Sequence, residues 1–453
     1  MRDESCWKQL AAIVGEEHVA FDIATLDGRW PWTPPKAIIR PASGEEVGEL
    51  LRLARSERMT LAAAGRMTKQ RLGGVPRPVD FILSLERIDR ITDYQPADLT
   101  VTVEAGLRMT ELGAALRNQK QMLPLDPPFG AEATVGGVIA TNGSGPRRLA
   151  YGTIRDMVVG IHFVTADGTR AKSGGKVVKN VAGYDMAKLL IGSLGSLAIV
   201  TDVTFKTFPI TPASATLLFG FREAEQALRA AERILHSPFA PQALDLVDPE
   251  GFALAGVRTK FFFPFVLAAW TAGPTQVVER LGKEIPALCR SGGQAGNELK
   301  IVRIEGEEEA DWWSAIQELT PSFLRSHSNG VVIKSSVVIR RIGEAVLATE
   351  RAGLDNHLSA GVLARTGNGV VYSYLWPKDG DSGEAALACA SESLVRKVED
   401  LGGRAIVEWA TAGVKERVNL WGTLREDFRL MQQIKAQFDP QGMLNPGRFY
   451  GGI

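Results

Sequence analysis

The sequence has little cysteine for its length of 453 residues. Its three cysteines, Cys6, Cys289 and Cys389, are far apart and form no Cys-x-x-Cys pair. Their spacing excludes a zinc site or an iron–sulfur cluster built from cysteine. A sparse, odd number of cysteines is typical of a reducing compartment, and the first 15 residues contain no long apolar stretch of the signal-peptide type. We therefore expect a cytoplasmic protein.

The sequence also lacks an excess of charge and a long hydrophobic run. Lys plus Arg and Asp plus Glu each number 52, so the net charge is zero, whereas nucleic-acid-binding proteins usually carry a basic excess. The most apolar run, FFFPFVLAAW at 261–270, contains a proline and is much shorter than the roughly 20 residues of a membrane-spanning helix. We expect no nucleic-acid partner and no integral membrane segment. Any attachment to the inner face of a membrane would be peripheral, through partner proteins.

What the sequence has in quantity is glycine, and the stretch TVGGVIATNGSGPRRLAYG at 134–152 is especially dense in it. Glycine exposes its backbone amide and readily adopts positive φ angles, so successive glycines can turn several N–H groups toward one anion. Thr134 is placed to cap a short helical turn, and Asn142 and Ser144 add side-chain hydrogen bonds. The stretch matches neither the Rossmann motif nor the phosphate-loop motif. Composition alone leaves two interpretations open, a phosphate-binding belt and a surface loop without a ligand.

Other loops favour the first interpretation. Glycine-bearing loops follow predicted strands at 62–74 (AAAGRMTKQRLGG) and at 174–205, and the rigid turn PLDPP at 124–128 precedes the glycine belt. Each loop permits close approach of the backbone to a ligand. Together they indicate one elongated ligand. The nearby Arg147, Arg148 and Arg155 either steer an anionic ligand toward the loops or are ordinary solvated residues.

Hydrophobic periodicity predicts a mixed α+β chain. Ser43 and Glu46 form a capping box ahead of apolar residues at helical spacing, which predicts a helix over 43–57. Beyond residue 211, strands alternate with amphipathic helices, as in a split βαβ, ferredoxin-like layer with helices on one face. Further helices are predicted at 110–118, 223–236, 275–288, 342–352, 381–401 and in the tail up to residue 438. Strands are predicted at 37–41, 60–65, 79–85, 99–106, 157–168, 196–210, 215–221, 265–270, 330–339, 369–376 and 404–410.

Taken together, these motifs resemble the FAD-binding flavoproteins related to vanillyl-alcohol oxidase and p-cresol methylhydroxylase, and most of all the FAD-binding E subunits of bacterial glycolate oxidases. The resemblance is carried by IIRPASGEEV, TVGGVIATNGSGPRRLAYGTIRD, VKNVAGYDMAKLLIGSLGSLAIVT and FDPQGMLNPGRF. It implies an α+β chain with a two-subdomain FAD-binding fold of the p-cresol methylhydroxylase type, then a ferredoxin-like cap domain, then a C-terminal segment that returns to the FAD domain. The implied parts are a leader at 1–30, an FAD-binding domain at 31–210, a cap at 211–410 and a C-terminal helix and tail at 411–453.

The resemblance implies an extended FAD along the glycine belt, with the residues around Asn445 to Arg448 packed on the flavin domain. The family's first loop is usually a run of glycines before a threonine, whereas here Arg66 and Met67 stand between Gly65 and Thr68. Arg66 either adds a charge to the phosphate contacts or crowds the loop. The loop has no histidine or cysteine, so we expect non-covalent FAD. The implied FAD-binding residues are Gly65, Thr68, Pro127, Thr134, Gly136, Gly137, Thr141, Asn142, Gly143, Ser144, Tyr151, Gly152, Gly195 and Ile199.

The resemblance also implies a comparison with the catalytic 2-hydroxyacid dehydrogenases of this group, from which the cap of this chain departs. Those enzymes carry paired histidines in the cap, which bind a metal and take the hydroxyl proton. Here LARTGNGVVYSYLW has Arg365 and Thr366 in the histidine context, and IVEWATAG keeps Glu408 but has Trp409 at the histidine position. Neither arginine nor tryptophan can act as a metal ligand or a base. We predict no metal site and assign no catalytic residue. The candidates for a base are Tyr372, Tyr374, His327 and Glu408, and the candidates for binding a carboxylate are Arg340, Arg341 and Arg365.

Three functions stay open at this point. The first is the FAD-binding subunit of a glycolate-oxidase-type complex that oxidises a small 2-hydroxy acid, with a catalytic flavin subunit and an iron–sulfur subunit as partners. The second is a self-sufficient FAD-dependent oxidoreductase of 2-hydroxy acids. The third is a flavin-free structural subunit of the complex, for which the first loop, with Arg66 and Met67, is the main support.

Overall fold

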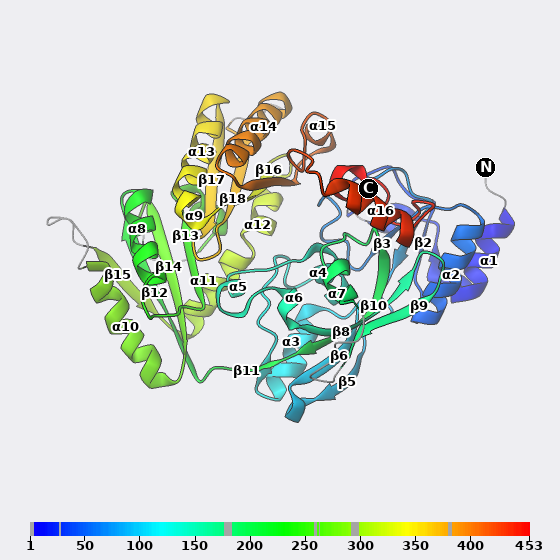
Figure 1. The fold of residues 1–453 in the computed structure, drawn as a ribbon, viewed down its shortest axis with the longest axis horizontal. Helices are drawn as coiled ribbons and strands as arrows, with labels where there is room; N and C mark the ends of the chain where they lie inside the picture. The colour runs from blue at the N-terminus through cyan, green and yellow to red at the C-terminus, as the bar shows by residue number, and fades with distance from the viewer. Residues whose placement is uncertain are drawn as a thin grey trace. The chain divides into compact units, whose positions relative to one another are not determined.

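The chain folds into two compact units in a computed structural model, which describes residues 4–26, 29–175, 184–257, 261, 263–290, 299–378 and 383–453 (Figure 1). Unit 1 is made of Met1–Ser144, Thr153–Ile210 and Leu424–Ile453, and unit 2 of Gly145–Gly152 and Thr211–Thr423. Unit 1 therefore combines three segments of the sequence, and its last segment returns after the whole of unit 2.

The first sheet of unit 1 has four strands in the order β1-β2-β4-β3. β2 and β3 both run parallel to β4, and the helix α2 connects β2 to β3. The predicted start of α2 is confirmed: the Ser43 hydroxyl accepts a hydrogen bond from the Glu46 amide at 3.2 Å. The Glu46 carboxylate accepts from the Ala42 amide at 2.8 Å, one residue before the position expected in a capping box. The elements are α1 Glu4–Val14, β1 Val19–Ala20, β2 Ala37–Ile39, α2 Gly44–Ser56, β3 Leu61–Ala64 and β4 Phe81–Ser84.

The second sheet of unit 1 has five antiparallel strands in the order β5-β6-β10-β8-β9. A short pair, β7 and β11, adds a two-stranded ribbon. The strands are β5 Ile91–Gln95, β6 Thr100–Glu104, β7 Gln121–Met122, β8 Val158–Thr165, β9 Arg170–Gly174, β10 Ala198–Lys206 and β11 Phe208–Pro209. The helices are α3 Met109–Asn118, α4 Val135–Thr141, α6 Ile154–Met157 and α7 Met186–Leu190.

The C-terminal segment closes unit 1 along strand β3. The helix α16 spans Phe428–Phe438, and the chain after it lies beside Leu61. The Leu61 amide donates to the Met443 carbonyl at 2.9 Å, and the Asn445 amide donates to the Leu61 carbonyl at 2.9 Å. Met443 and Leu444 are buried in the same core cluster as Phe81. The C-terminal residues are thus an integral part of the unit that begins at the other end of the chain.

Unit 2 contains one eight-stranded antiparallel sheet in the order β15-β12-β14-β13-β17-β18-β16-β19. Its two halves have the same chain path, strand–helix–strand–strand–helix–strand, and each half has the strand order of a ferredoxin-like fold. The predicted ferredoxin-like layer is confirmed, and it occurs twice, joined where β13 pairs with β17. The first half has β12 Ala213–Phe221, α8 Ala224–Leu235, β13 Ala243–Val247, β14 Phe265–Gly273, α10 Thr275–Arg290 and β15 Lys300–Ile304. The second half has β16 Val331–Ser336, α13 Ile342–Asp355, β17 Leu358–Arg365, β18 Val370–Pro377, α14 Glu384–Asp400 and β19 Arg404–Trp409.

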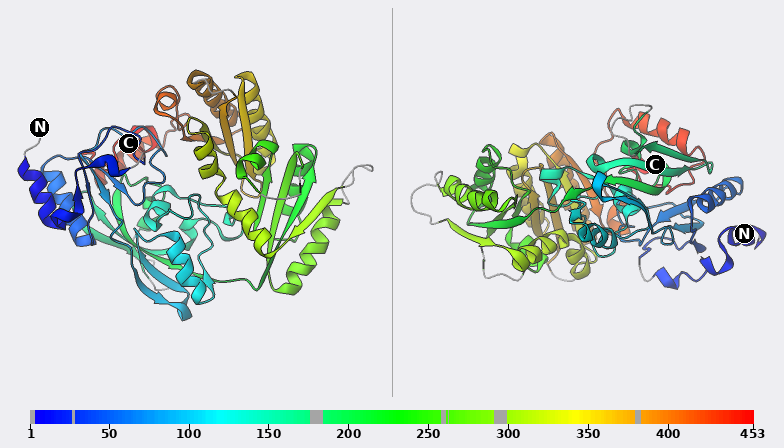
Figure 2. Two further views of the ribbon diagram at one scale, coloured as in Figure 1. Left: turned by 180° about the vertical axis from the view of Figure 1, so that it is seen from behind. Right: turned by 90° about the horizontal axis from the view of Figure 1, so that it is seen from below.

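The two faces of this sheet differ in what covers them. Side chains of α8, α10, α13 and α14 share one core cluster with alternate residues of the strands, such as Phe219 and Val371. The opposite face carries Thr216 and Trp270, both of which contact Trp313 of α11. Figure 2 shows the ribbon of the sheet and its helices from two further directions. The remaining helices are α5 Arg148–Tyr151, α9 Pro249–Ala255, α11 Gly306–Gln317, α12 Leu319–Ser326 and α15 Ala412–Lys415, with short 3-10 turns at Glu16–His18, Ile23–Leu26, Pro96–Asp98, Ile339–Arg341 and Tyr450–Gly452.

Candidate functional site

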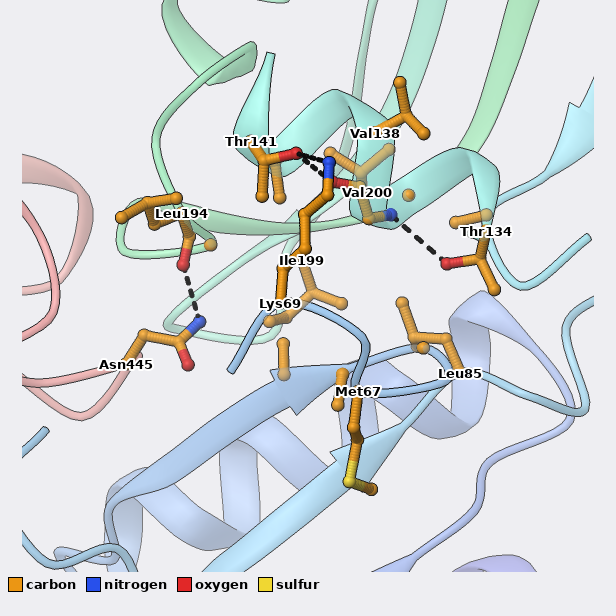
Figure 3. Close-up of a pocket in the computed structure, with 18 of the residues that line it drawn as sticks. Met67, Lys69, Leu85, Thr134, Val138, Thr141, Leu194, Ile199, Val200 and Asn445 are labelled. Carbon is orange, nitrogen blue, oxygen red and sulfur yellow. Dashed lines mark hydrogen bonds between the residues drawn. The ribbon is translucent and has the colours of Figure 1, made fainter. Parts of the chain in front are cut away.

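A pocket in unit 1 lies where the three glycine-bearing loops meet the C-terminal segment (Figure 3). Its lining comes from 63–70 after β3, from 133–141 around α4, from 190–200 before and within β10, and from Asn445 and Arg448. Its empty volume is about 870 Å³, counting space that is open to solvent.

The first loop touches the glycine belt directly. A Cβ atom on Gly65 would lie 2.3 Å from the Thr134 hydroxyl, so only glycine allows this approach. Arg66 lines the pocket, and its Nε donates to the Glu132 carboxylate at 2.8 Å. This hydrogen bond is the main reason that the pKa of Arg66 is raised. Because Glu132 already balances the charge of Arg66, the structure favours neither of the two roles that the sequence left open for it.

The glycine belt forms the short helix α4 and exposes its backbone to the pocket. Thr134 caps the helix by accepting from the Gly137 amide at 3.3 Å, as the sequence predicts. Gly136 is packed on Ala105, whose carbonyl oxygen would lie 3.0 Å from an added Cβ atom. Lys69 extends from the first loop to the far end of the helix, where its Nζ donates to the Thr141 hydroxyl at 3.4 Å (Figure 3).

The third loop is held by the C-terminal segment. The Asn445 amide group donates to the Leu194 carbonyl at 2.9 Å (Figure 3). Gly195 has a φ of +69°, and a Cβ atom there would lie 2.5 Å from the Asn445 Nδ2. The Leu194 amide in turn donates to the Ala140 carbonyl of α4 at 2.8 Å. These contacts join the third loop, the belt and the C-terminal segment into one wall.

The residues of this pocket fit FAD. Bare backbone at Gly137, where an added Cβ atom would meet only the Thr134 hydroxyl, permits close approach of a long ligand. Leu85, Val138 and Ile199 supply apolar surface for ring systems. Two buried polar atoms at the wall, Oδ1 of Asn445 and Nε of Arg448, have no hydrogen-bond partner among the described residues. Because buried polar atoms are normally hydrogen-bonded, a bound ligand with acceptor and donor groups would complete them.

Eight of the predicted FAD-binding residues line the pocket, and six do not. Those that do are Gly65, Thr68, Thr134, Gly136, Gly137, Thr141, Gly195 and Ile199. Asn142, which ends α4 with a φ of +48°, and then Gly143 and Ser144 come directly after the lining residue Thr141 in the sequence. Pro127 lies beside Gly143, where an added Cβ atom would be 3.4 Å from it. Tyr151 and Gly152 belong to unit 2, where the Tyr151 hydroxyl accepts from Gln242 at 3.0 Å. For these six, contact with FAD stays a prediction.

Several pocket residues were not among the predicted ones. Lys69 lies in the same loop as Gly65, and its long charged side chain after a glycine-bearing turn is a signal that the sequence offers. Leu85, Ala105 and Leu190 come from the ends of distant elements, and no local pattern marks them as pocket residues. The described residues that line the pocket include no histidine or cysteine.

A cluster of polar residues lies on the face of the unit 2 sheet opposite α8, α10, α13 and α14, and it includes Arg365 and Glu408 of the cap motifs. Arg365 of β17 donates to Asp245 of β13 at 2.6 Å, and both side chains are buried. Lys334 of β16 lies 3.6 Å from the Glu408 carboxylate of β19. The ring of Tyr372 has the Lys334 ammonium 5.8 Å and the Arg365 guanidinium 5.6 Å from its centroid. Tyr372 and Glu408 raise the pKa of Lys334, so this lysine is a cation within a compact polar cluster.

The other candidate bases have local structural partners. Tyr374 is fully buried, its hydroxyl is 2.9 Å from that of Thr320, and burial raises its pKa. His327 stacks on Phe323, with the ring centroids 5.3 Å apart, and burial lowers its pKa. Among the residues that the structure describes, no group of three or more His, Cys, Asp or Glu side chains is arranged to hold a metal ion. Within the same residues, no helix has both the length and the apolar character needed to cross a membrane.

Comparison with known proteins defines the class. The family described as FAD binding domain matches residues 35–174, and the family described as FAD linked oxidases, C-terminal domain, matches residues 210–449. The chain belongs to the FAD-linked oxidase family. It is an FAD-dependent oxidoreductase, FAD is its cofactor, and the flavin-free alternative is set aside.

Relatives and solved structures agree with this assignment. The chain is 27% identical over 425 residues to the glycolate oxidase subunit GlcD of Bacillus subtilis, covering 92% of this chain and 89% of the relative. It is 28% identical over 440 residues to a D-lactate dehydrogenase of Archaeoglobus fulgidus, covering 94% and 95%. A shorter match, 39% identical over 171 residues, joins 37% of this chain to 48% of the glycolate oxidase subunit GlcE of Escherichia coli. The fold matches that of p-cresol methylhydroxylase with a TM-score of 0.80 at 16% identity, covering 98% and 97%. The resemblance stated from the sequence is confirmed.

Proposed function

We propose that this protein is the FAD-binding subunit of a complex that oxidises a small 2-hydroxy acid. The relatives that support the substrate class are named for glycolate, D-lactate and D-2-hydroxyglutarate. The observation that carries the proposal is a pocket whose residues fit FAD, in a chain whose cap has Arg365 and Trp409 at the positions where the family resemblance leads us to expect histidines. A catalytic flavin subunit and an iron–sulfur subunit would be its partners. The complex would be cytoplasmic, or held at the inner face of the membrane by those partners.

In this proposal FAD is bound without a covalent link, since no histidine or cysteine lines the pocket. The backbone at Gly65, Gly136, Gly137 and Gly195 lies against the cofactor, while Thr134 and Thr141 hold the belt in shape. When bound, FAD supplies a two-electron acceptor, and the protein sets its position and its electrostatic surroundings.

A second candidate function, a self-sufficient oxidoreductase, is favoured by the polar cluster of unit 2. Lys334 offers a cation for the substrate carboxylate, and Glu408 beside it offers an acceptor for the hydroxyl proton. Oxidation of a 2-hydroxy acid requires both tasks, because a carboxylate must be bound and the hydroxyl must lose its proton. The two residues lie together on the same face of the sheet, on neighbouring strands β16 and β19.

Anaerobic reduction of the flavin separates the two functions. The chain is purified with FAD, and glycolate or D-lactate is added without oxygen while the flavin absorbance is recorded. A flavin that is bleached only when the partner subunits are present supports the subunit proposal. Bleaching of the chain alone contradicts it and favours the self-sufficient enzyme. In that case Glu408→Gln should abolish the bleaching, whereas Glu305→Gln, a surface change in the same unit, should not.

A further inference from the structure

Arg448 is a buried cation in the wall of the FAD pocket. Its side chain is 4% exposed, and burial lowers its pKa to about 10. One terminal nitrogen donates to the Gln70 side-chain oxygen at 2.8 Å, and the other donates to the carbonyls of Lys69 and Leu72, each at 3.0 Å. All these partners are neutral oxygens of the first loop, so Arg448 holds the shape of that loop.

Among the described residues, no carboxylate pairs with the charge of Arg448. Its guanidinium bonds only neutral oxygens of the first loop, and burial lowers its pKa. Two other largely enclosed cations of the described residues have a carboxylate partner: Arg365 pairs with Asp245 and Lys435 with Asp439, each at 2.6 Å. Burying a charge without a partner is costly. The Nε of Arg448 is also buried without a hydrogen-bond partner.

We propose that Arg448 pairs with the diphosphate of FAD, and that its Nε donates a hydrogen bond to a phosphate oxygen. This inference rests on the proposed position of FAD in the pocket. The diphosphate is the anionic part of FAD, so it is the part that an unbalanced guanidinium in the pocket wall can neutralise. Arginine suits this task because its fixed fork of N–H donors can bond loop carbonyls and phosphate oxygens at the same time.

The same residue couples the C-terminal segment to the first loop. The Gly74 amide donates to the Arg448 carbonyl at 2.8 Å, and the Arg77 amide donates to the Pro446 carbonyl at 2.9 Å. The loop held in this way carries Lys69, whose Nζ lies beside Thr141 on the other side of the pocket. Binding of the diphosphate therefore depends on docking of a segment that follows the rest of the pocket by more than 240 positions in sequence.

The test measures binding to the apoprotein of three probes: FAD, riboflavin, which has no phosphate, and ADP, which has a diphosphate but no flavin. Arg448→Gln keeps polar donors but removes the charge, and it should weaken binding of FAD and ADP about 10- to 100-fold while leaving riboflavin binding within about twofold. Arg448→Lys should lie between Arg448→Gln and the wild type. Arg77→Gln is the matched control, because Arg77 is an exposed neighbour that bonds the Gly452 carbonyl and does not line the pocket.

Two results would overturn the proposal. One is unchanged FAD and ADP affinity in Arg448→Gln, and the other is an equal loss for riboflavin, which would mean that Arg448 only shapes the loop. If Arg448→Gln does not fold, Arg448→Lys decides: it should weaken FAD and ADP binding and spare riboflavin, and no difference between the probes would contradict the pairing. These measurements need no hydroxy acid, so failure of the substrate proposal leaves them intact.

Discussion

At the scale of single residues, two adjacent glycines of the belt have different reasons to be glycine. Gly136 is packed so tightly on Ala105 that a Cβ atom would lie 2.9 Å from its Cβ and 3.0 Å from its carbonyl oxygen. A Cβ atom on Gly137 would meet only the Thr134 hydroxyl, at 3.2 Å. The first glycine is required by the packing of the protein, whether or not a cofactor is bound. The second lines the pocket with open space in front of it, which is where we expect the cofactor.

Gly137→Val should therefore reduce FAD binding more than it reduces stability. Glycine and valine are both poor helix formers, so the change in helix propensity is small, whereas the new side chain occupies space needed by the cofactor. We expect the purified variant to contain less than half of the wild-type flavin, measured by absorbance, and to unfold within about 1 kcal/mol of the wild-type apoprotein. Gly136→Ala is the control, and should destabilise the apoprotein by about 1–3 kcal/mol through overpacking. Normal flavin content in Gly137→Val would place the cofactor elsewhere.

Asp248 makes stability depend on pH. It caps α9, and its Oδ1 accepts from the amides of Gly251 and Val362 at 2.7 and 2.8 Å. Burial raises its pKa from 3.8 to about 7, so the folded state holds this proton more tightly than the unfolded state does. The resulting stabilisation is complete below pH 3.8 and is lost as the pH rises to about 7, by about 4 kcal/mol at most.

Asp248→Asn should remove this dependence, because the amide keeps an oxygen acceptor and does not titrate. Denaturant unfolding of both proteins between pH 4 and 8 gives the difference in their free energies of unfolding. We expect the wild type to lose stability relative to the variant over pH 4 to 7 and the difference to be constant above that range. A difference that does not change with pH would show that Asp248 is ionised throughout.

Residue chemistry in the site was predictable in part. The glycines and Thr134 could be recognised because their roles depend on the local backbone. The pairing of Arg66 with Glu132 could not, since the two residues are distant in sequence and meet only through the fold. The neutral partners of Arg448, with no carboxylate beside it among the described residues, are likewise a property of the folded interior that no sequence pattern reports.

At the scale of elements, the two halves of unit 2 are joined at a seam, the pairing of β13 with β17, and this seam is where a substitution should affect the stability of the unit. β13 and β17 pair over three residue pairs, and one of these is Asp245 with Arg365. The Thr366 hydroxyl adds a hydrogen bond to the Leu244 carbonyl at 2.7 Å. A short ladder thus joins two ferredoxin-like halves, with a buried ion pair across it.

Asp245→Asn should weaken this seam by about 3–5 kcal/mol, because it leaves the buried Arg365 charge without its partner. The double change Asp245→Leu with Arg365→Met removes both charges and should recover most of the stability. Thermal unfolding of the three proteins measures both effects. Equal stability of Asp245→Asn and the wild type would mean that water or another group compensates Arg365 and that the pair does not stabilise the seam.

The elements show why a second ferredoxin-like half was not foreseen. Helices with one apolar face, such as α8 and α10, were predicted to within two residues at each end. The strands β13, β15 and β17 were missed. β13 is buried along its whole length and β15 is a largely exposed edge strand, so neither alternates between apolar and polar residues in the way that identifies a strand. Without them, the doubled sheet cannot be counted from the sequence.

At the scale of the whole molecule, the pocket of unit 1 is built from parts of the chain that are distant in sequence. The pocket takes three walls from the first loop, the belt and the third loop. The fourth wall is the C-terminal segment, which most of unit 2 separates from the other three along the chain. A ligand that contacts all four walls binds only the folded unit. Its binding free energy therefore adds to the stability of every wall at once.

Hydrogen exchange should reveal this coupling. With FAD at about 100 times its Kd, the stabilisation is about 2.7 kcal/mol, or about 100-fold slower exchange through global unfolding of the unit. We expect slower exchange at 63–74, 134–141, 190–200 and 445–448 together, measured by mass spectrometry with and without FAD. Strand β14 of unit 2, whose ladder partners β12 and β13 lie in its own sheet, serves as the internal reference.

In Arg448→Gln the protection at 445–448 should fall with that of the first loop, because Arg448 joins them. Protection of the belt alone would mean that FAD does not reach the C-terminal wall, and would separate the glycine belt from the rest of the proposed site.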